Sequence, residues 1–116
     1  FGAFGGRLDH HLASVFLPTD PEIGPFMTQL CLMDRQNYLC YRPAGRHTIQ
    51  PLAGYTYVAF MPVEGASIQI EGAKYPLNST NYFKKAIYGS NEFSNQPITL
   101  SVDRGYAVII YSKDGK

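Results

Sequence analysis

The chain contains little charge and no tryptophan. Only 16% of its 116 residues are charged, and Lys+Arg 10 against Asp+Glu 9 gives a formal net charge of +1. Because phosphate recognition needs a clustered excess of Lys and Arg, we expect no nucleic-acid partner. No apolar run reaches the roughly 20 residues that span a bilayer, so no membrane insertion is expected. The hydrophobic share of 45% is sufficient for a folded core, which excludes wholesale disorder.

The sequence also lacks the motifs of common catalytic and cofactor sites. Its glycines form no phosphate-binding loop between a strand and a helix, and no G-x-S-x-G nucleophile elbow occurs. Asp9, His10 and His11 are adjacent, but neighbouring histidines on a strand point to opposite faces and do not easily share one metal. His47 has no carboxylate nearby in sequence. We therefore predict a protein that is not an enzyme, with no catalytic residue, no cofactor and no metal.

Only two cysteines are present, and a hairpin would place them opposite each other. Folding residues 29–41 about Arg35-Gln36 pairs Cys31 with Cys40. With a two-residue loop they form a non-hydrogen-bonded pair, with Cα atoms about 4.5 Å apart, and a cross-strand disulfide is feasible. A four-residue loop makes them a wider, hydrogen-bonded pair. Because Arg-Gln is a poor sequence for a tight turn, two reduced core thiols remain the alternative to a disulfide.

What the sequence does contain is a series of short segments typical of β-strands. Nine Tyr and seven Phe residues favour extended structure. The segments are 13–17, 26–33, 38–42, 46–50, 55–61, 67–71, 81–88, 98–102 and 106–111, with turn residues between them. The last of them is apolar on both faces, as expected for a central strand. About eight short strands without a long helix predict an all-β fold, an antiparallel β-sandwich or jelly roll.

The N-terminus differs in composition from the rest of the chain. Its first six residues have too much glycine for a helix and too little length for a packed strand. We predict a flexible Gly-rich arm over residues 1–12 and a single β-sandwich domain over residues 13–116. Phe1 and Phe4 are the arm residues that we expect to contact a neighbouring subunit.

Four tyrosines are candidates for a binding surface. By a period of two, Tyr55 and Tyr57 share one strand face, and so do Tyr82 and Tyr88. Aromatic faces stack on sugar rings, which suggests a glycan-binding surface, although the absence of Trp argues against it. Tyr is equally common in half-buried sheets and in protein–protein interfaces. These tyrosines are therefore candidate glycan or interface residues.

Four stretches between Arg46 and Ser112 combine strand and turn residues in a fixed order: 48–57, 87–89, 97–102 and 105–111. In this order they resemble small β-rich accessory virion proteins of tailed bacteriophages, in which such a run closes a compact C-terminal β-domain. The resemblance implies a capsid decoration, head fibre or tail-associated protein located in the virion. Its partners would be other copies of itself and a larger capsid or tail protein. We accordingly predict a non-enzymatic structural subunit that acts through protein–protein contacts.

Two alternatives to the virion subunit remain open. One is a carbohydrate-binding or adhesin module that uses its surface tyrosines, in which case the protein is extracellular. The other is a secreted effector stabilised by a disulfide, which predicts an oxidised Cys31–Cys40 pair.

Overall fold

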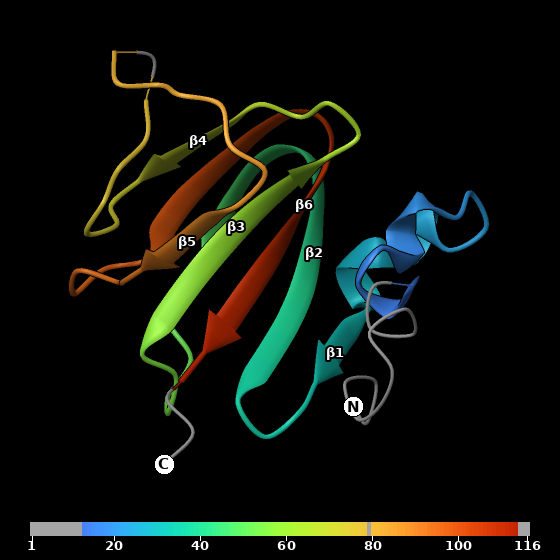
Figure 1. Ribbon diagram of the computed structural model, residues 1–116, viewed down its shortest axis with the longest axis horizontal. Coiled ribbons are helices and arrows are strands. Elements are labelled where there is room, and N and C mark those ends of the chain that lie inside the picture. Colours follow the sequence, from blue (N-terminus) through green and yellow to red (C-terminus); the bar gives the residue numbers. More distant parts are fainter. Residues whose placement is uncertain (1–12, 79, 114–116) are drawn as a thin grey trace.

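The chain folds as one antiparallel β-sheet preceded by two short 3₁₀ helices (Figure 1). The computed structural model describes residues 13–78 and 80–113. The 3₁₀ helices are η1 (Leu17–Thr19) and η2 (Gly24–Gln29). The six strands are β1 (Cys31–Met33), β2 (Asn37–Ile49), β3 (Tyr57–Val63), β4 (Ile68–Glu71), β5 (Tyr88–Asn91) and β6 (Ile98–Ser112).

Two long strands organise the sheet, whose order is β1-β2-β6-β3-β5, with β4 paired to β6 outside this path. The C-terminal half of β6 pairs with β3, whereas its N-terminal half pairs with β4. β2 pairs with both halves, and its register shifts between Pro43 and Gly45. Gly105 stands at the corresponding point of β6 with φ 62, where an added Cβ would collide with the Val63 carbonyl oxygen. The chain therefore needs glycine where the sheet bends.

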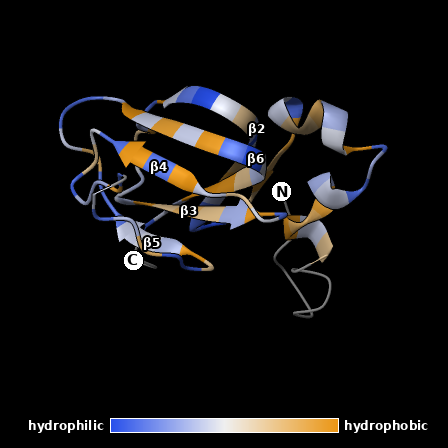
Figure 2. Cartoon of the chain, turned by 90° about the horizontal axis from the view of Figure 1, so that it is seen from above, coloured by the Kyte–Doolittle hydropathy of each residue, from blue (hydrophilic) through white to orange (hydrophobic). Residues whose placement is uncertain are grey.

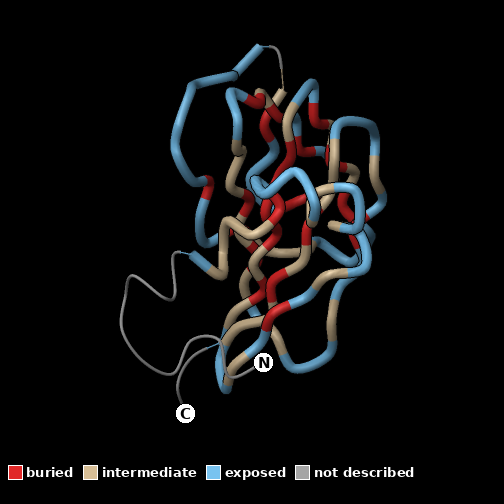
Figure 3. Tube along the Cα trace, turned by 90° about the vertical axis from the view of Figure 1, so that its right-hand side faces the viewer, coloured by how far each residue is buried: buried red, intermediate tan, exposed pale blue. Residues whose placement is uncertain are grey.

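The main core lies on one face of this bent sheet. In β6 the inward residues alternate, and Ile98, Leu100 and Val102 are all buried as the period of two predicts. β3 contributes Val58 and Phe60 to the same cluster, and β4 contributes its isoleucines. Each such side chain stabilises the fold by roughly 1.5–3 kcal/mol when fully buried. Figure 2 shows the alternation of apolar and polar residues along β4 and β6, and Figure 3 shows the buried stretches running through the middle of the molecule.

A second apolar cluster covers the opposite face of the sheet at β1, β2 and the C-terminal half of β6. Its buried members are Leu32, Leu39, Tyr41, Tyr106 and Val108, and the N-terminal segment packs against them. The Tyr41 hydroxyl donates to the Val15 carbonyl at 2.9 Å, and the Tyr106 hydroxyl lies 2.7 Å from Thr19 Oγ1. The C-terminal half of β6 is thus buried on both faces, which confirms the prediction of a central strand.

The expectation of a mostly antiparallel β fold is confirmed, but the number and limits of the strands differ. The described residues form six strands in one sheet, whereas about eight were expected. The difference at residues 38–50 and 98–111 arises because each predicted pair of strands is one long strand, bent at a glycine instead of interrupted by a turn.

Three predicted strands have another structure over all or part of their length. Residues 13–15 are helical, and η1 follows with Pro18 in its first turn, where a missing N–H costs nothing. Residues 24–29 form η2, so the first strand begins at Cys31. Residues 81–87 are irregular and exposed, and β5 begins only at Tyr88. The predicted arm of residues 1–12, with Phe1 and Phe4, lies outside the described residues. Within the described ranges, no helix has the length and apolarity needed to span a bilayer.

Candidate functional site

The long connection between β4 and β5, together with the end of β5, has an irregular backbone. It is tied down by single bridges, Ile70 to Leu77 and Ala73 to Phe93, in place of a continuous ladder. Gly72 has φ 88 and Ser90 has φ 57, a region that non-glycine residues seldom adopt. Non-glycine residues keep such angles only where their surroundings hold them, and they are concentrated at functional sites.

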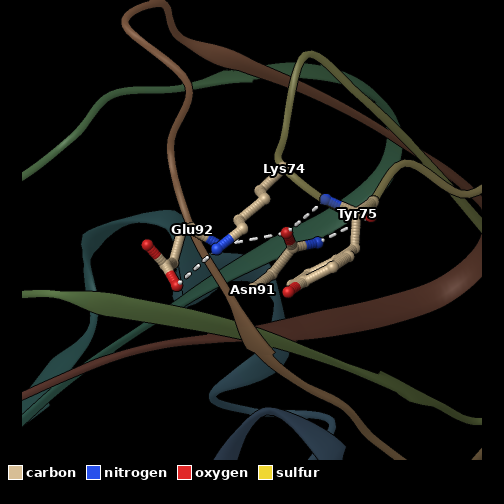
Figure 4. Close-up of polar contacts among 4 residues, drawn as sticks. All are labelled: Lys74, Tyr75, Asn91 and Glu92. Atoms are coloured by element: carbon tan, nitrogen blue, oxygen red, sulfur yellow. Dashed lines mark hydrogen bonds and ion pairs between the residues drawn. The ribbon is translucent and has the colours of Figure 1, made fainter.

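Asn91 fixes the backbone of this connection. It is 3% exposed and is the one buried polar residue in the described part of the chain. Its Oδ1 accepts a hydrogen bond from the Tyr75 N–H at 2.9 Å, and its Nδ2 donates to the Tyr75 carbonyl at 2.9 Å (Figure 4). The Glu92 N–H also donates to Oδ1 at 2.9 Å. The amide therefore supplies the hydrogen-bond partners that a neighbouring strand would give Tyr75, and Tyr75 as a residue remains 58% exposed.

Lys74 lies beside the Tyr75 ring and is paired with Glu92. Lys74 Nζ lies 3.5 Å from Glu92 Oε2 and 5.5 Å from the centre of the Tyr75 ring. The Glu92 carboxylate raises the pKa of Lys74, so the ammonium group stays charged at neutral pH. The Lys74 N–H also donates to the Glu92 carbonyl at 2.9 Å. We call these four residues, Lys74, Tyr75, Asn91 and Glu92, the Asn91 site.

A cavity of about 340 Å³ opens beside the Asn91 site, and we call it the aromatic cavity. Its walls are mainly apolar and comprise Ile70, Tyr75, Pro76, Leu77, Phe83, Tyr88, Gly89 and Asn91. The Phe83 and Tyr88 rings meet edge to face at 5.7 Å, and the Tyr88 hydroxyl donates to the Phe83 carbonyl at 2.5 Å. Cavities of this size and composition are typical of sites for small organic molecules.

A larger cavity of about 590 Å³, the polar cavity, lies where β4, β6 and the bend of β2 meet. Its lining residues are Gly45, Ser67, Ile68, Gln69, Tyr82, Ser101, Val102 and Asp103. The Tyr82 hydroxyl donates to Ser67 Oγ at 3.3 Å, and Asp103 Oδ1 accepts from the Ser67 N–H at 2.6 Å. Residues 73–88 thus contribute to both cavities, since Tyr75 lines one and Tyr82 the other.

The four predicted tyrosines have different surroundings. Tyr82 and Tyr88 line different cavities, because residues 81–87 are not a strand. Tyr55 precedes β3 and packs edge to face against Tyr38 and Tyr111, with ring centres 6.5 and 6.2 Å away. Tyr57 is half-buried in β3 and lines neither cavity.

Sequence reasoning missed all four residues of the Asn91 site. Residues 89–96 were expected to be a polar loop. Because the segment shows no alternation of polar and apolar residues, the sequence does not indicate that one of its asparagines is buried. The cysteines, in contrast, have the register of a two-residue hairpin loop: Cys31 is paired with Cys40, and both are free thiols. No group of three potential metal ligands occurs among the residues that the structure describes.

Residues 46–107 match the family described as thiamin pyrophosphokinase, vitamin B1 binding domain. These residues are more than half of the chain, which therefore belongs to this family. They include the whole Asn91 site and all the residues that line the aromatic cavity. No curated protein matches the chain at a significant level.

Solved structures of bacterial proteins have the same fold. A protein from Lactobacillus plantarum has a TM-score of 0.89 and 34% identity, over 97% of this chain and 53% of its own. A thiamin pyrophosphokinase family protein from Enterococcus faecalis has a TM-score of 0.85 and 34% identity, over 97% and 54%. Thiamine pyrophosphokinase from Bacillus subtilis has a TM-score of 0.78 and 28% identity, over 98% and 54%. The chain spans about half the length of these structures.

The family corrects the functional predictions. The resemblance to bacteriophage virion proteins is wrong, because residues 46–107 match a thiamin pyrophosphokinase domain and similar structures belong to that family. A virion location and capsid or tail partners are wrong for the same reason. The prediction of a non-enzymatic structural subunit is also wrong, because the family takes its name from a kinase. Neither the adhesin module nor the secreted effector gains support.

Proposed function

We propose that this chain is the thiamin-binding part of a thiamin pyrophosphokinase, an enzyme that transfers a pyrophosphate group from ATP to thiamin. The family match over residues 46–107 carries the proposal. Because the chain spans about half of the similar structures, the complete reaction is proposed for the whole enzyme. The role proposed for the described residues is to bind thiamin and present its hydroxyl group to the donor.

The chemistry of thiamin fits the Asn91 site and the aromatic cavity. Thiamin carries a flat aminopyrimidine and a positively charged thiazolium ring, and aromatic faces attract both by stacking and by cation–π interaction. Tyr75 offers an exposed ring at the mouth of a cavity whose wall also includes Phe83. The Glu92 carboxylate, which pairs with Lys74 at 3.5 Å, supplies a negative charge to the Asn91 site. We assign Tyr75 as the stacking platform.

Asn91 has a positioning role in this proposal. Its amide holds both backbone polar groups of Tyr75, and its Oδ1 accepts two N–H groups. The ring that meets the ligand therefore stands on a fixed backbone, which reduces the entropy lost when thiamin binds. The strained Ser90, with φ 57, is the residue that directs Asn91 inward from the end of β5.

The bent sheet provides the rigid support for this site. We propose that the bent sheet is a β-sandwich. The two halves of β6, on either side of the bend, contribute side chains to one shared core. Ile98 and Leu100 come from the half that pairs with β4, and Ile109 comes from the half that pairs with β3. A site on such a scaffold is more precisely held than one on free loops.

Thiamin titration into the full chain, followed by calorimetry, tests the proposal. We expect Tyr75→Ala to weaken binding about tenfold, since a desolvated cation–π contact is worth on the order of 1–2 kcal/mol. Tyr75→Phe keeps the ring and should bind nearly as well as the wild type. Phe26→Ala removes an equally exposed ring in η2, far from the site, and should have no effect.

Variants of the polar cavity decide between the two cavities. If Gln69→Ala abolishes binding while Tyr75→Ala leaves it intact, thiamin occupies the polar cavity and the assignment of Tyr75 is wrong. If the folded wild-type chain does not bind thiamin at all, thiamin binding by this part alone is wrong.

A further inference from the structure

The two cysteines lie in a groove that the proposed function does not use. A cavity of about 270 Å³ at the edge of the sheet is lined by Cys31 of β1 and by Tyr38, Cys40 and Arg42 of β2, among others. In the strand order β1 is at one end of the sheet and β5, which carries Asn91, is at the other. Figure 1 shows the same separation, with β1 beside the 3₁₀ helices and β5 on the far side of β3.

The hairpin geometry suits a bond between the two sulfur atoms. Cys31 and Cys40 are direct partners in the β1–β2 register. At the loop, the Asp34 N–H donates to the Asn37 carbonyl at 2.9 Å, so this is a hydrogen-bonded pair. Counting back three pairs makes Cys31 and Cys40 a non-hydrogen-bonded pair, because the two kinds alternate. Cα atoms in such a pair are about 4.5 Å apart, within the range of a disulfide.

The two thiols differ in a way that separates their roles. Cys31 is exposed, whereas Cys40 is half-buried and packs against the main core. Burial raises the pKa of the Cys40 thiol, an effect that the nearby Arg42 guanidinium partly opposes. The interaction with Cys31 raises the pKa of the Tyr38 phenol. An exposed thiol that reacts first and a sheltered thiol that resolves the mixed disulfide are typical of redox-active pairs.

We propose that Cys31 and Cys40 form a redox-active dithiol site that reacts with a low-molecular-weight disulfide and closes to a cross-strand disulfide. The Cys31 thiolate attacks one sulfur of the small disulfide, forms a mixed disulfide and releases one small thiol. The Cys40 thiolate then attacks Cys31 Sγ, forms the internal bond and releases the second small thiol. Two protein thiols are oxidised, one small disulfide is reduced, and both thiol protons end on the released thiols.

The expected consequence is local. β1 has only three residues and joins the sheet through β2 alone, and η2 precedes it directly. A bond at Cys31–Cys40 would pin this edge strand, and with it η2, to the body of the sheet. Because the bond closes a loop of few residues, the gain in stability is at the small end of the range for disulfides.

Mass spectrometry of the full chain treated with glutathione disulfide tests the proposal. We expect the wild type to lose two hydrogens and to retain no glutathione. Cys40→Ser should stop at one stable glutathione adduct on Cys31, because the resolving thiol is missing. Cys31→Ser should react at least about tenfold more slowly than Cys40→Ser, because only the sheltered thiol remains.

A tryptic digest of the oxidised wild type detects the internal disulfide directly, without any variant. Arg35 lies between the cysteines, so trypsin under non-reducing conditions should release two peptides joined by a bond, which a reductant separates. Three results would overturn the proposal: a wild type that keeps a stable glutathione adduct, oxidation only between chains, or equal rates for the two serine variants. None of these readouts involves thiamin, so they are independent of the proposed function.

Discussion

The body of the sheet and the Asn91 site are stabilised in different ways. β2, β3 and β6 are held by long ladders, with one register shift between β2 and β6, and by side chains that are completely buried. The connection that precedes β5 is held by isolated bridges, and one buried amide holds Tyr75 in place. The body therefore depends on apolar area, which many residues share. The site depends on a few directional hydrogen bonds, so single substitutions can change the position of a ligand-binding ring without unfolding the domain.

The largest effect is expected in the body. Phe60 of β3 is fully buried in the main core, and Phe60→Ala should lower the free energy of unfolding by about 3–5 kcal/mol. Urea denaturation followed by circular dichroism measures it. Phe26→Ala, at a 60% exposed ring, is the control and should stay within about 0.5 kcal/mol of the wild type. If both variants lower the free energy of unfolding equally, Phe60 is not the buried core residue that the structure describes.

The next effect is at the bend of the sheet. Gly105→Ala places a Cβ against the Val63 carbonyl oxygen at a left-handed φ, and we expect a loss of about 2–3 kcal/mol. Gly54 also has a positive φ, but an added Cβ meets nothing within 4 Å. Gly54→Ala should therefore cost only about 1 kcal/mol of backbone strain. The difference between the unfolding midpoints of the two alanine variants therefore measures the steric clash, because both variants share the strain of a positive φ.

Asn91→Ala tests the site by itself. It leaves both backbone polar groups of Tyr75 without their partner, at a cost of about 1–3 kcal/mol. It should also weaken thiamin binding, because the Tyr75 ring loses its fixed position. Asn78→Ala removes an amide that accepts hydrogen bonds from the N–H and hydroxyl groups of Thr80 in its own exposed turn, and it should leave binding unchanged. If Asn91→Ala lowers stability but leaves thiamin affinity intact, Asn91 does not position the platform.

The body should be more sensitive to alkali than the site. Burial raises the pKa of the Tyr41 and Tyr111 phenols in the folded protein. An unfolded tyrosine has a pKa of about 10, so their stabilising contribution is complete below about pH 10 and is lost as the pH rises toward the raised values. Tyr111→Phe loses a hydrogen bond to the Gln50 carbonyl but should show a shallower fall in unfolding midpoint above pH 10. If the unfolding midpoint of the variant falls as steeply with pH as that of the wild type, ionisation of Tyr111 does not cause the loss of stability in alkali.

The smallest effect is expected at the ion pair of the site. Lys74 and Glu92 are both accessible to solvent, and exposed pairs contribute little to stability. Lys74→Met should therefore leave the urea midpoint unchanged. Because it frees the Glu92 carboxylate, thiamin binding should become slightly tighter at low salt and the same as wild type at high salt. A weaker affinity in Lys74→Met would mean that Lys74 itself contributes to binding.

Several elements of the body could be predicted from the sequence. The alternation of Ile98, Leu100 and Val102 identified an inward face, and the apolar run of residues 106–111 identified a strand buried on both sides. The pairing of Cys31 with Cys40 followed from symmetry about one turn. What could not be predicted was whether a glycine interrupts a strand or bends it, since Gly45 and Gly105 are compatible with both. That choice depends on β3 and β4, which pair with different halves of β6.

The site was missed for a physical reason. Asn91 belongs to a run of polar residues that resembles a solvated loop, and its burial depends on Tyr75, which lies on the preceding connection. The proposed functional residues therefore carry no periodic signal of their own. The family, too, was misjudged, because strand-and-turn patterns are common to many small β domains.

The low charge and the hydrophobic share of 45% indicated a chain that can form a folded core. The sequence by itself also determined the β class and the faces of its clearest strands, because a period of two and the bulk of β-branched and aromatic residues act locally. Tertiary structure alone decided that two long strands bend, that a buried asparagine holds Tyr75, and that Tyr75 and Tyr88 line one cavity. Those facts depend on contacts between residues far apart in the chain, and local preferences do not specify such contacts.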